Sequence, residues 1–467
     1  MNHKKFLAIL VCLTAMLTSC KKYLDVNPKS SVSESQLFSS ELGFQQALDG
    51  VYSLFASQNL FGDNLTMGFT SALAQNYAIP LNQRFYDTAT FNFTSEEVAG
   101  FGSSIWTNGY NAIAGANKVI QNTEKRRDVL STSAYSRIRG EAVALRAYMH
   151  FELLRLFGPE YVSGISKKAI PYKKDVNQST SVPLTTQNTV LAILADLNEA
   201  EQLLSKSDPI LNGQTNRNIK MNYYAVKALE ARVYLFSGDK SKAFTAAKLV
   251  VDANKFPFVT FGAATAEDQN KDRIYITEQI FGLRVANLKD WADPGYFRGA
   301  SNMRRPTTDY FKLYEGSSTD IRYIAGIDVD DSNKAGITFC SKFWQTYPGI
   351  NPSDDRLDQL VPMIRLSEMY YILAECASTT TDGINYLNIV RENRNIKTPL
   401  ASNLSQADLN DEITKEYQKE FHAEGQLFFY YKRKNITRMQ FMTSDIPLSK
   451  YVLPIPDQEL EFNPNYN

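Results

Sequence analysis

The sequence predicts a mostly α-helical fold built on tetratricopeptide-like helix pairs, with one excursion of loops and a short β-hairpin. Several long stretches repeat apolar residues three and four positions apart, which is the period of one helix face. Two stretches, residues 223–252 and 364–395, also show the small-residue pattern of a helical hairpin. Between them, residues 255–362 are interrupted by proline and glycine and contain short alternating runs.

Four helices are expected before the first hairpin. Ser39 or Ser40 caps the first, Gly158-Pro159 stops the third and Thr185 opens the fourth. We expect Trp106, on the second, to be a core residue. The periodic positions of the four helices are Phe44, Ala47, Leu48, Val51 and Phe55; Trp106, Tyr110, Ile113, Asn117 and Ile120; Ile138, Ala142, Leu145, Met149, Glu152 and Leu156; and Leu191, Leu194, Leu197 and Leu204.

The two helical hairpins share a small residue at the predicted crossing of their helices. A small residue lets two helices approach closely, so we expect Ala231 and Ala374 to lie at close crossings. The first hairpin turns at Ser237-Gly238-Asp239. The positions that define the pattern are Ala231, Tyr234, Gly238 and Ala243 in the first hairpin, and Tyr370, Ala374, Ala377, Leu387 and Val390 in the second.

The segment between the hairpins predicts a β-hairpin. Alternating runs at Ile321 to Asp328 and Ile337 to Phe343 flank the turn-forming Asp330-Asp331-Ser332-Asn333. Residues 62–102 are likewise aromatic and irregular. Long ordered loops on a rigid scaffold are where binding surfaces usually lie.

The N-terminus predicts secretion and a lipid anchor. A basic start precedes the apolar run Phe6 to Leu17, which is too short to span a bilayer but suits a signal peptide. The run ends at Leu17-Thr18-Ser19-Cys20, which resembles the bacterial lipobox. Residues 1–19 are therefore predicted to be a lipoprotein signal peptide, and residues 20–35 a lipidated cysteine and tether. An ordinary signal peptide with a chance cysteine is the alternative.

Composition indicates a globular chain without a nucleic-acid partner. Fifty basic residues balance fifty acidic residues, so the chain carries no net field to recruit nucleic acid. The hydrophobic content of 43% and charged content of 21% are those of a folded domain. Cys340 and Cys376 are the two cysteines after Cys20; we expect free thiols, with a single disulfide as the alternative.

The chain resembles the SusD/RagB family, the surface lipoproteins of nutrient uptake systems of the Bacteroidetes type. The resemblance runs through nearly the whole mature chain in the family's order. Two stretches depart from the family pattern. Many members have arginine after the glutamate where this chain has Glu416-Tyr417, and a tryptophan-containing run where this chain has Gln426 to Tyr431. We expect these positions to be structural. The matching stretches are Cys20 to Asp25 with Asn27-Pro28, Gly140 to Ala142, Leu145 to Tyr148, Arg155 to Gly158, Arg365 to Glu368, Ala374-Glu375, Leu387 to Arg391, Glu420-Phe421, Glu424-Gly425 and Leu453 to Pro456.

The resemblance implies a SusD-like N-terminal helical-repeat region at 36–254 and a C-terminal SusD/RagB region at 255–467. It also implies an outer-membrane location, facing the cell exterior, and a SusC-like TonB-dependent transporter as partner. The ligand would be an oligosaccharide or another nutrient, which the protein captures and delivers. The alternative is a tetratricopeptide-type adaptor whose concave face binds a protein or peptide. Ligand residues are not among the shared motifs, so none is carried over.

Little in the sequence predicts catalysis, a metal or a cofactor. His150 and His422 are expected on separate helices without ligand-spaced cysteines. Asp328, Asp330 and Asp331 lack the glycine and terminal glutamate of an EF-hand loop, so a solvated turn is the better interpretation. The glutamates of the helical motifs are expected to pair with arginines such as Arg146 or Arg391 rather than to act as acid and base. These glutamates are Glu141, Glu152, Glu375 and Glu424.

Two aromatic segments are the candidate ligand-binding residues. Residues 290–298 have no helical period and contain turn residues, so Trp291 is either a platform for a sugar ring or a plug that fixes the loop. Its neighbours Asp293, Tyr296 and Arg298 would supply hydrogen bonds. The second, weaker segment contains Tyr77, Phe85 and Tyr86, near Asn76 and Arg84.

Overall fold

A computed structural model of the chain describes most residues from 33 to 466. The gaps in the description are residues 178, 215, 268–269, 287, 293–294, 297–303, 331–336 and 345–358. The predicted signal peptide and Cys20 lie outside the described residues. Helix α2 (Glu34–Leu37), with Ser33 as its N-cap, begins within the predicted tether.

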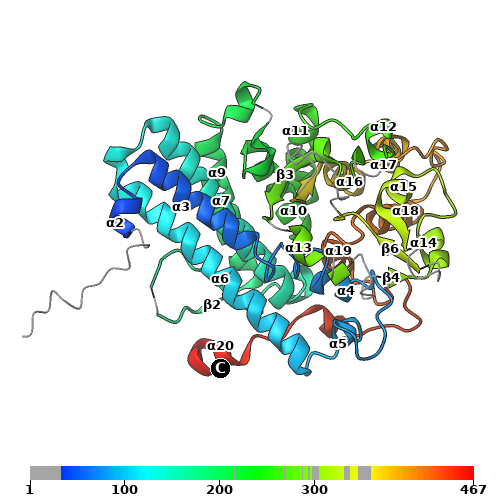
Figure 1. The fold of residues 1–467 in the computed structure, drawn as a ribbon, viewed down its shortest axis with the longest axis horizontal. Coiled ribbons are helices and arrows are strands. Elements are labelled where there is room, and N and C mark those ends of the chain that lie inside the picture. Colours follow the sequence, from blue (N-terminus) through cyan, green and yellow to red (C-terminus); the bar gives the residue numbers. More distant parts are fainter. Residues whose placement is uncertain are drawn as a thin grey trace, which may run out of the picture.

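Long antiparallel helices form the N-terminal half, and α3, α6 and α7 lie side by side (Figure 1). Helix α7 is buried over nearly all of its second half because α6 packs on one side and α9 on another. Gly109 and Gly140 permit these contacts, since a Cβ at either would come within about 3 Å of Leu153 or Leu204. The bounds are α3 (Glu41–Phe55), α6 (Glu96–Lys125), α7 (Thr132–Phe157) and α9 (Thr186–Leu204).

The caps of these helices are as predicted. The Ser40 hydroxyl accepts from Gly43 N and the Thr185 hydroxyl from Asn188 N, and α7 ends at Gly158. Trp106 is buried in the core, at 5% exposed. Leu191 was expected on the apolar face of α9 but is 57% exposed. The buried face of α9 is formed by Val190, Ile193, Leu197, Ala200 and Leu204, so Leu197 and Leu204 are buried as predicted, whereas Leu194 is half-buried.

Both predicted helical hairpins are present. Helices α10 (Tyr223–Phe236) and α11 (Lys240–Asp252) form the first, and α16 (Leu366–Cys376) and α17 (Thr380–Asn393) form the second. Ala231 and Ala374 are buried, and a Cβ at Gly383 would lie 2.7 Å from the Ala374 carbonyl oxygen, which shows how closely α17 approaches α16. Helix α11 also packs against α16, so the two hairpins are stacked as a repeat scaffold requires.

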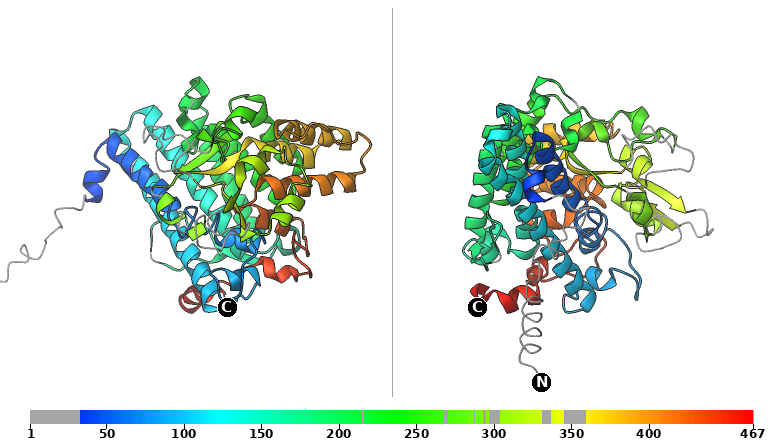
Figure 2. Two further views of the ribbon diagram at one scale, coloured as in Figure 1. Left: turned by 45° about the vertical axis from the view of Figure 1, so that its right-hand side comes forward. Right: turned by 60° about the vertical axis from the view of Figure 1, so that its left-hand side comes forward.

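Three small antiparallel sheets accompany the helices. Strand β1 (Lys168–Pro171) pairs with β2 (Pro183–Thr185), and β3 (Gln279–Arg284) with β7 (Leu360–Arg365). The third sheet has the order β4-β6-β5. In Figure 2 the yellow-green strands of the third sheet lie away from the long N-terminal helices, whereas strands β1 and β2 contact α9. The bounds of the third sheet are β4 (Arg304–Arg305), β5 (Ile327–Asp330) and β6 (Ile337–Cys340).

The predicted β-hairpin is present but shorter on its first side. Strands β5 and β6 pair antiparallel, with Asp328 opposite Phe339. Ile321 to Gly326, predicted as part of the first strand, instead forms helix α15. The reason is Asp320, whose carboxylate accepts from Arg322 N and caps the helix.

The C-terminal region continues with α18 (Gln406–Glu420) and α19 (Leu427–Arg433), and helix α20 lies near the C-terminus beside α6 (Figure 1). Glu416 and the aromatic run of α19 are buried, as expected of structural positions. The remaining short helices are α4 (Phe69–Leu73), α5 (Tyr86–Ala89), α8 (Tyr161–Gly164), α12 (Phe261–Ala264), α13 (Leu288–Ala292), α14 (Thr307–Leu313) and α20 (Asp457–Phe462). The 3₁₀ segments are η2 (Arg127–Val129), η3 (Pro209–Asn212), η4 (Asn216–Ile219), η6 (Ile276–Glu278), η9 (Leu448–Tyr451) and η10 (Pro464–Tyr466).

Candidate functional site

The loop between α3 and α4 forms the base of the candidate site. Its backbone closes on itself: Phe61 N donates to Phe55 O at 3.0 Å, and Gly68 N donates to Asp63 O at 2.9 Å. Leu60 through Leu73 are all buried. Asp63 is therefore held by the turn, with only 3% of its side chain exposed.

Asp63 joins the two aromatic segments that were predicted separately. Arg84 Nη2 donates to Asp63 Oδ2 at 2.9 Å, and the Tyr296 hydroxyl donates to Asp63 Oδ1. Arg84 Nη1 also lies 3.4 Å from the Tyr296 hydroxyl. Residues 233 positions apart in the chain thus share one hydrogen-bonded cluster. We call Asp63, Arg84, Trp291 and Tyr296 the Arg84 cluster.

Electrostatics keep the two partners of Arg84 in different protonation states. Burial raises the pKa of Asp63 above its ordinary value, while the charge of Arg84 and the hydrogen bond from Tyr296 oppose that shift. Burial and the neighbouring Asp63 raise the pKa of Tyr296 well above its usual range. The phenol therefore remains a neutral donor, and Arg84 balances the carboxylate.

Local backbone strain orients Arg84. Phe85 has a φ of +70°, a left-handed conformation that costs a residue with a side chain about 1–3 kcal/mol. Two contacts hold it there: Phe85 N donates to Glu97 Oε1 at 2.9 Å, and the Phe85 ring stacks on Phe101 at 5.1 Å between centroids. The Arg84 guanidinium lies over the Phe85 ring, 4.3 Å from its centroid, while 43% of its side chain stays exposed. Arg84 can therefore offer donors to a ligand without moving.

Trp291, on α13, is the fourth member of this cluster and is partly buried. Its Nε1 donates to Gly62 O, one residue before Asp63, at 3.3 Å. The hydrogen bond fixes the ring to the loop, as expected of a plug, whereas partial exposure leaves ring surface available to a ligand. Both interpretations of Trp291 therefore remain predictions.

The structure distributes the other predicted residues differently. Tyr77 and Phe85 are buried, with Tyr77 donating to Met67 O at 2.9 Å, so both lie behind the surface. Tyr86 is half-buried. Asp293 and Arg298 lie outside the described residues. Asp63 was missed because Gly62-Asp63-Asn64 reads as an ordinary turn, and its distant partners leave no local signal.

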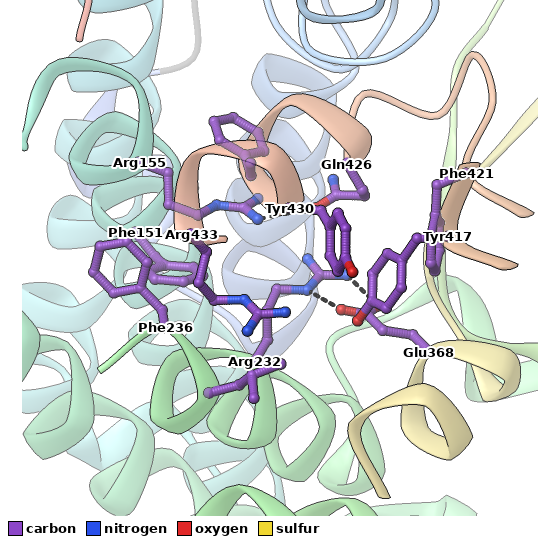
Figure 3. Close-up of a pocket in the computed structure, with 12 residues that line it drawn as sticks. Phe151, Arg155, Arg232, Phe236, Glu368, Tyr417, Phe421, Gln426, Tyr430 and Arg433 are labelled. Carbon is purple, nitrogen blue, oxygen red and sulfur yellow. Dashed lines mark hydrogen bonds and ion pairs between the residues drawn. The ribbon is translucent and has the colours of Figure 1, made fainter. Parts of the chain in front are cut away.

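A separate cavity, shown in Figure 3, lies among α7, α10, α16, α18 and α19. Arg155, Arg232 and Arg433 line it together with Glu368, which pairs with Arg232 at 2.6 Å. Its volume is about 40 Å³. Pockets that hold small molecules measure about 300–1,000 Å³. This cavity therefore has room for a few water molecules but not for a sugar ring.

The glutamates considered for acid–base chemistry are each paired with a cation. Arg146 and Arg391, named above as partners, instead bind Asp196 and Glu416. The observed pairs are Glu141 with Arg217, Glu152 with Arg155, Glu375 with Arg433, and Glu424 with Lys342 and Arg365.

The described residues contain no group of three or more His, Cys, Asp or Glu side chains placed to hold a metal ion. His150 lies on α7, whereas His422, also expected on a helix, follows the end of α18. Cys340 and Cys376 are free. In the described part of the chain, none of the helices combines the length and hydropathy that a membrane span requires.

Comparison with known proteins decides the family. A family model described as "Starch-binding associating with outer membrane" matches residues 22–235, and the model of the SusD family matches residues 296–467. The chain belongs to the SusD/RagB family. The SusD-like protein P25 of Formosa agariphila is 23% identical to this SusD-like chain over 533 residues, covering 96% of this chain and 94% of P25.

Solved structures show the same fold. A SusD superfamily protein of Bacteroides thetaiotaomicron superposes with a TM-score of 0.72 at 21% identity, covering 91% of this chain and 98% of that one. A SusD-like carbohydrate binding protein of Bacteroides vulgatus gives a TM-score of 0.71 at 18% identity, covering 91% and 97%. The architecture described above is therefore that of the SusD superfamily.

Proposed function

We propose that this SusD-like protein is a cell-surface carbohydrate-binding lipoprotein that captures an oligosaccharide without cleaving it. In this role it delivers the sugar to a SusC-like TonB-dependent transporter. Family membership supports the general role, and the carbohydrate-binding protein of Bacteroides vulgatus is a relative in fold. The observation that carries the proposal is the Arg84 cluster, where an exposed guanidinium bonded to Asp63 and a partly exposed indole ring bonded to Gly62 O are held by neighbouring residues of one loop.

The chemistry of the Arg84 cluster suits a sugar. A sugar ring has an apolar C–H face and a rim of hydroxyls, so an aromatic ring beside fixed polar groups matches it. Asp63 and Tyr296 hold Arg84 in place, so binding needs little reordering of the side chain. Trp291 would stack on the ring face while Arg84 donates to the hydroxyls.

Trp291→Ala is expected to weaken oligosaccharide binding by roughly 1–3 kcal/mol while leaving the melting temperature nearly unchanged. A panel of oligosaccharides, screened by thermal shift, supplies the ligand, and calorimetry then measures affinity on wild type and variant. Arg84→Met is expected to weaken binding by about 1.5–3 kcal/mol, the value of hydrogen bonds to a charged group.

Arg438→Met is the matched control, because Arg438 is also an exposed arginine paired with an aspartate, Asp445. It should bind as the wild type does. If Trp291→Ala lowers the melting temperature markedly and affinity falls only through unfolding, Trp291 is a plug and the platform role is wrong. Retention of a polypeptide, with no response to any oligosaccharide, would favour the tetratricopeptide-type adaptor.

Cys20→Ala is expected to release the protein from the membrane fraction, because the thiol is the proposed site of lipid attachment. Acyl chains bind a membrane with about 0.8 kcal/mol per buried methylene, so losing them removes the anchor. Fractionation and immunoblotting of cells that carry each form measure the outcome. A signal-cleaved Cys20→Ala protein that stays in the outer-membrane fraction would contradict the anchor.

A further inference from the structure

A second cavity, distinct from the Arg84 cluster, lies where η3, η4, the segment after α11 and strand β3 meet. Its volume is about 660 Å³, within the range of small-molecule sites. We call it the Lys255 cavity. The residues that give it its chemistry are Asn218, Lys255, Phe256, Gln279 and Arg284.

The charges in the Lys255 cavity are all of one sign. Lys255 and Arg284 both line it and are exposed, and neither forms an ion pair with any described residue. The described residues of the lining include no carboxylate. Most other arginines of this chain, such as Arg146, Arg232 and Arg394, are already neutralised by carboxylates. Two uncompensated cations in one concave site favour an anionic group there.

Backbone structure places both cations. Helix α11 ends at Asp252, and Asn254 then takes a left-handed conformation with a φ of +50°, which turns the chain outward just before Lys255. Arg284 is the single exposed residue of β3 and pairs with Leu360 at the end of its ladder. Both residues thus line the same cavity, one from just after a helix end and the other from the end of a strand.

Neutral parts of the cavity suit the body of a saccharide. Phe256 and Ile219 supply apolar surface, and Asn218 supplies an amide beside them. Gln279 is fully buried, donates through Nε2 to Ile274 O at 3.2 Å, and has no partner for its Oε1 atom. The Gln279 amide is therefore part of the buried wall of the cavity rather than an exposed contact for a ligand.

We propose that the Lys255 cavity binds the negatively charged group, carboxylate or sulfate, of an acidic saccharide, with Lys255 and Arg284 as its counter-ions. The saccharide nature of this ligand rests on the proposed function. Arg284 precedes Trp291 by seven residues, so the backbones of these two residues lie no more than about 25 Å apart.

The test compares charged and uncharged forms of the same sugars. Tetragalacturonate is matched with its full methyl ester, and a κ-carrageenan tetrasaccharide with its desulfated form. Each is titrated by calorimetry in 20 mM and 500 mM NaCl. Wild type should bind at least one charged form ten-fold or more tighter than its neutral counterpart at low salt, with a smaller advantage at high salt. An advantage in the galacturonate pair identifies the bound group as a carboxylate, and an advantage in the carrageenan pair identifies it as a sulfate.

The double variant Lys255→Gln/Arg284→Gln should lose that advantage and bind charged and neutral forms alike. The control is Arg137→Gln/Lys312→Gln, which removes two cations that form no ion pair with described residues and lie on α7 and α14; it should keep the advantage. An unchanged advantage in the cavity variant, or no preference for charge in the wild type, would overturn the proposal. The Arg84 cluster is tested independently by Trp291→Ala, which removes no charge: it should weaken neutral and charged sugars equally, whereas the cavity variant affects charged sugars alone.

Discussion

Arg394→Met is expected to destabilise the protein by about 3–5 kcal/mol, the cost of removing one partner from a buried ion pair. Arg394 is completely buried and bonds two carboxylates that are equally buried, Glu278 and Glu420. Its guanidinium donates to both oxygens of Glu278 at 2.7 Å and to Glu420 at 2.6 and 3.0 Å. Methionine fills similar volume but leaves both carboxylates without these bonds. Urea unfolding of wild type and variant measures the loss.

The loss should be large because Arg394 belongs to a continuous buried network. Arg365 bonds Glu420 and Glu424, and Arg322 bonds Glu416 at 2.6 Å. These side chains come from η6, β7, α15, α17 and α18 and their flanking residues, so the network joins elements that lie far apart in the sequence. A charge without a partner inside this network cannot reach water without separating helices.

Arg438→Met is the stability control for Arg394→Met. Arg438 is 60% exposed and its pair with Asp445 is solvated, so its removal should cost no more than about 1 kcal/mol. If Arg394→Met costs as little as this control, the network is not a determinant of stability. A variant that fails to accumulate as soluble protein, beside a normally expressed Arg438→Met, agrees with the expected loss.

The ion network also explains how the Arg84 cluster is supported. Glu424, bonded to Lys342 and Arg365, is followed by Gly425, which has a φ of +74°. A Cβ at Gly425 would overlap the Leu65 carbonyl oxygen in the loop that holds Asp63. Ala423 N donates to Asn76 Oδ1 at 3.0 Å in the same region. The C-terminal helices thus hold the loop after α3 in place, which makes the position of Arg84 a property of the whole fold.

The helical scaffold could be predicted from sequence because its signals are local. Periodicity and caps within twenty residues specify α3, α7 and α9, and a turn glycine specifies the α10–α11 hairpin. The errors arose where the local signal was ambiguous. In α9, Val190 and Leu191 are adjacent apolar residues at the edge of the helix face, and the fold buries Val190 and exposes Leu191. Before β5, six residues fit either a strand or a helix, and the Asp320 cap decides for the helix.

The candidate site could be predicted only in part, because its decisive contacts join distant residues. The aromatic segments around Arg84 and Trp291 were identified by composition, but no spacing in the chain predicts that Asp63 connects them. Pairs such as Arg394 with Glu278 are invisible for the same reason, since 116 residues separate them. Sequence therefore identified candidate side chains, and the fold determined which of them lie together.

Stability is expected to fall steeply below pH 6.5 because His150 and His422 are buried without charge. Burial lowers the pKa of His150 to about 3, and its ring is satisfied as a neutral tautomer between Arg146 O and Lys173 N. Burial, with Lys342 and Arg305 nearby, lowers the pKa of His422 well below its usual value. In the unfolded chain both histidines titrate with a pKa of about 6.5.

The direction in which the free energy of unfolding changes with pH follows from proton binding. Below pH 6.5 the unfolded state takes up two protons that the native state does not, so the histidine contribution is fully present above pH 6.5 and is lost as pH falls toward 3. Between pH 6.5 and 5 this loss amounts to about 3 kcal/mol. Asp272 has the opposite effect on stability as the pH falls. Burial raises its pKa to about 6, so the native state takes up this proton at a higher pH than the unfolded state does. The histidine effect is therefore measured as a difference between proteins.

Urea unfolding at pH 7.5, 6.5, 5.5 and 5.0 should show this difference between the wild type and His150→Gln/His422→Gln. Glutamine keeps an amide donor and acceptor but does not titrate, so the variant starts less stable at pH 7.5 and loses about 3 kcal/mol less between pH 6.5 and 5. Each single variant should remove part of the extra slope, since the two rings belong to different elements, α7 and the turn after α18. Parallel stability curves for all four proteins would mean that both histidines can be protonated within the folded protein, and that the packing around them opens before the fold does.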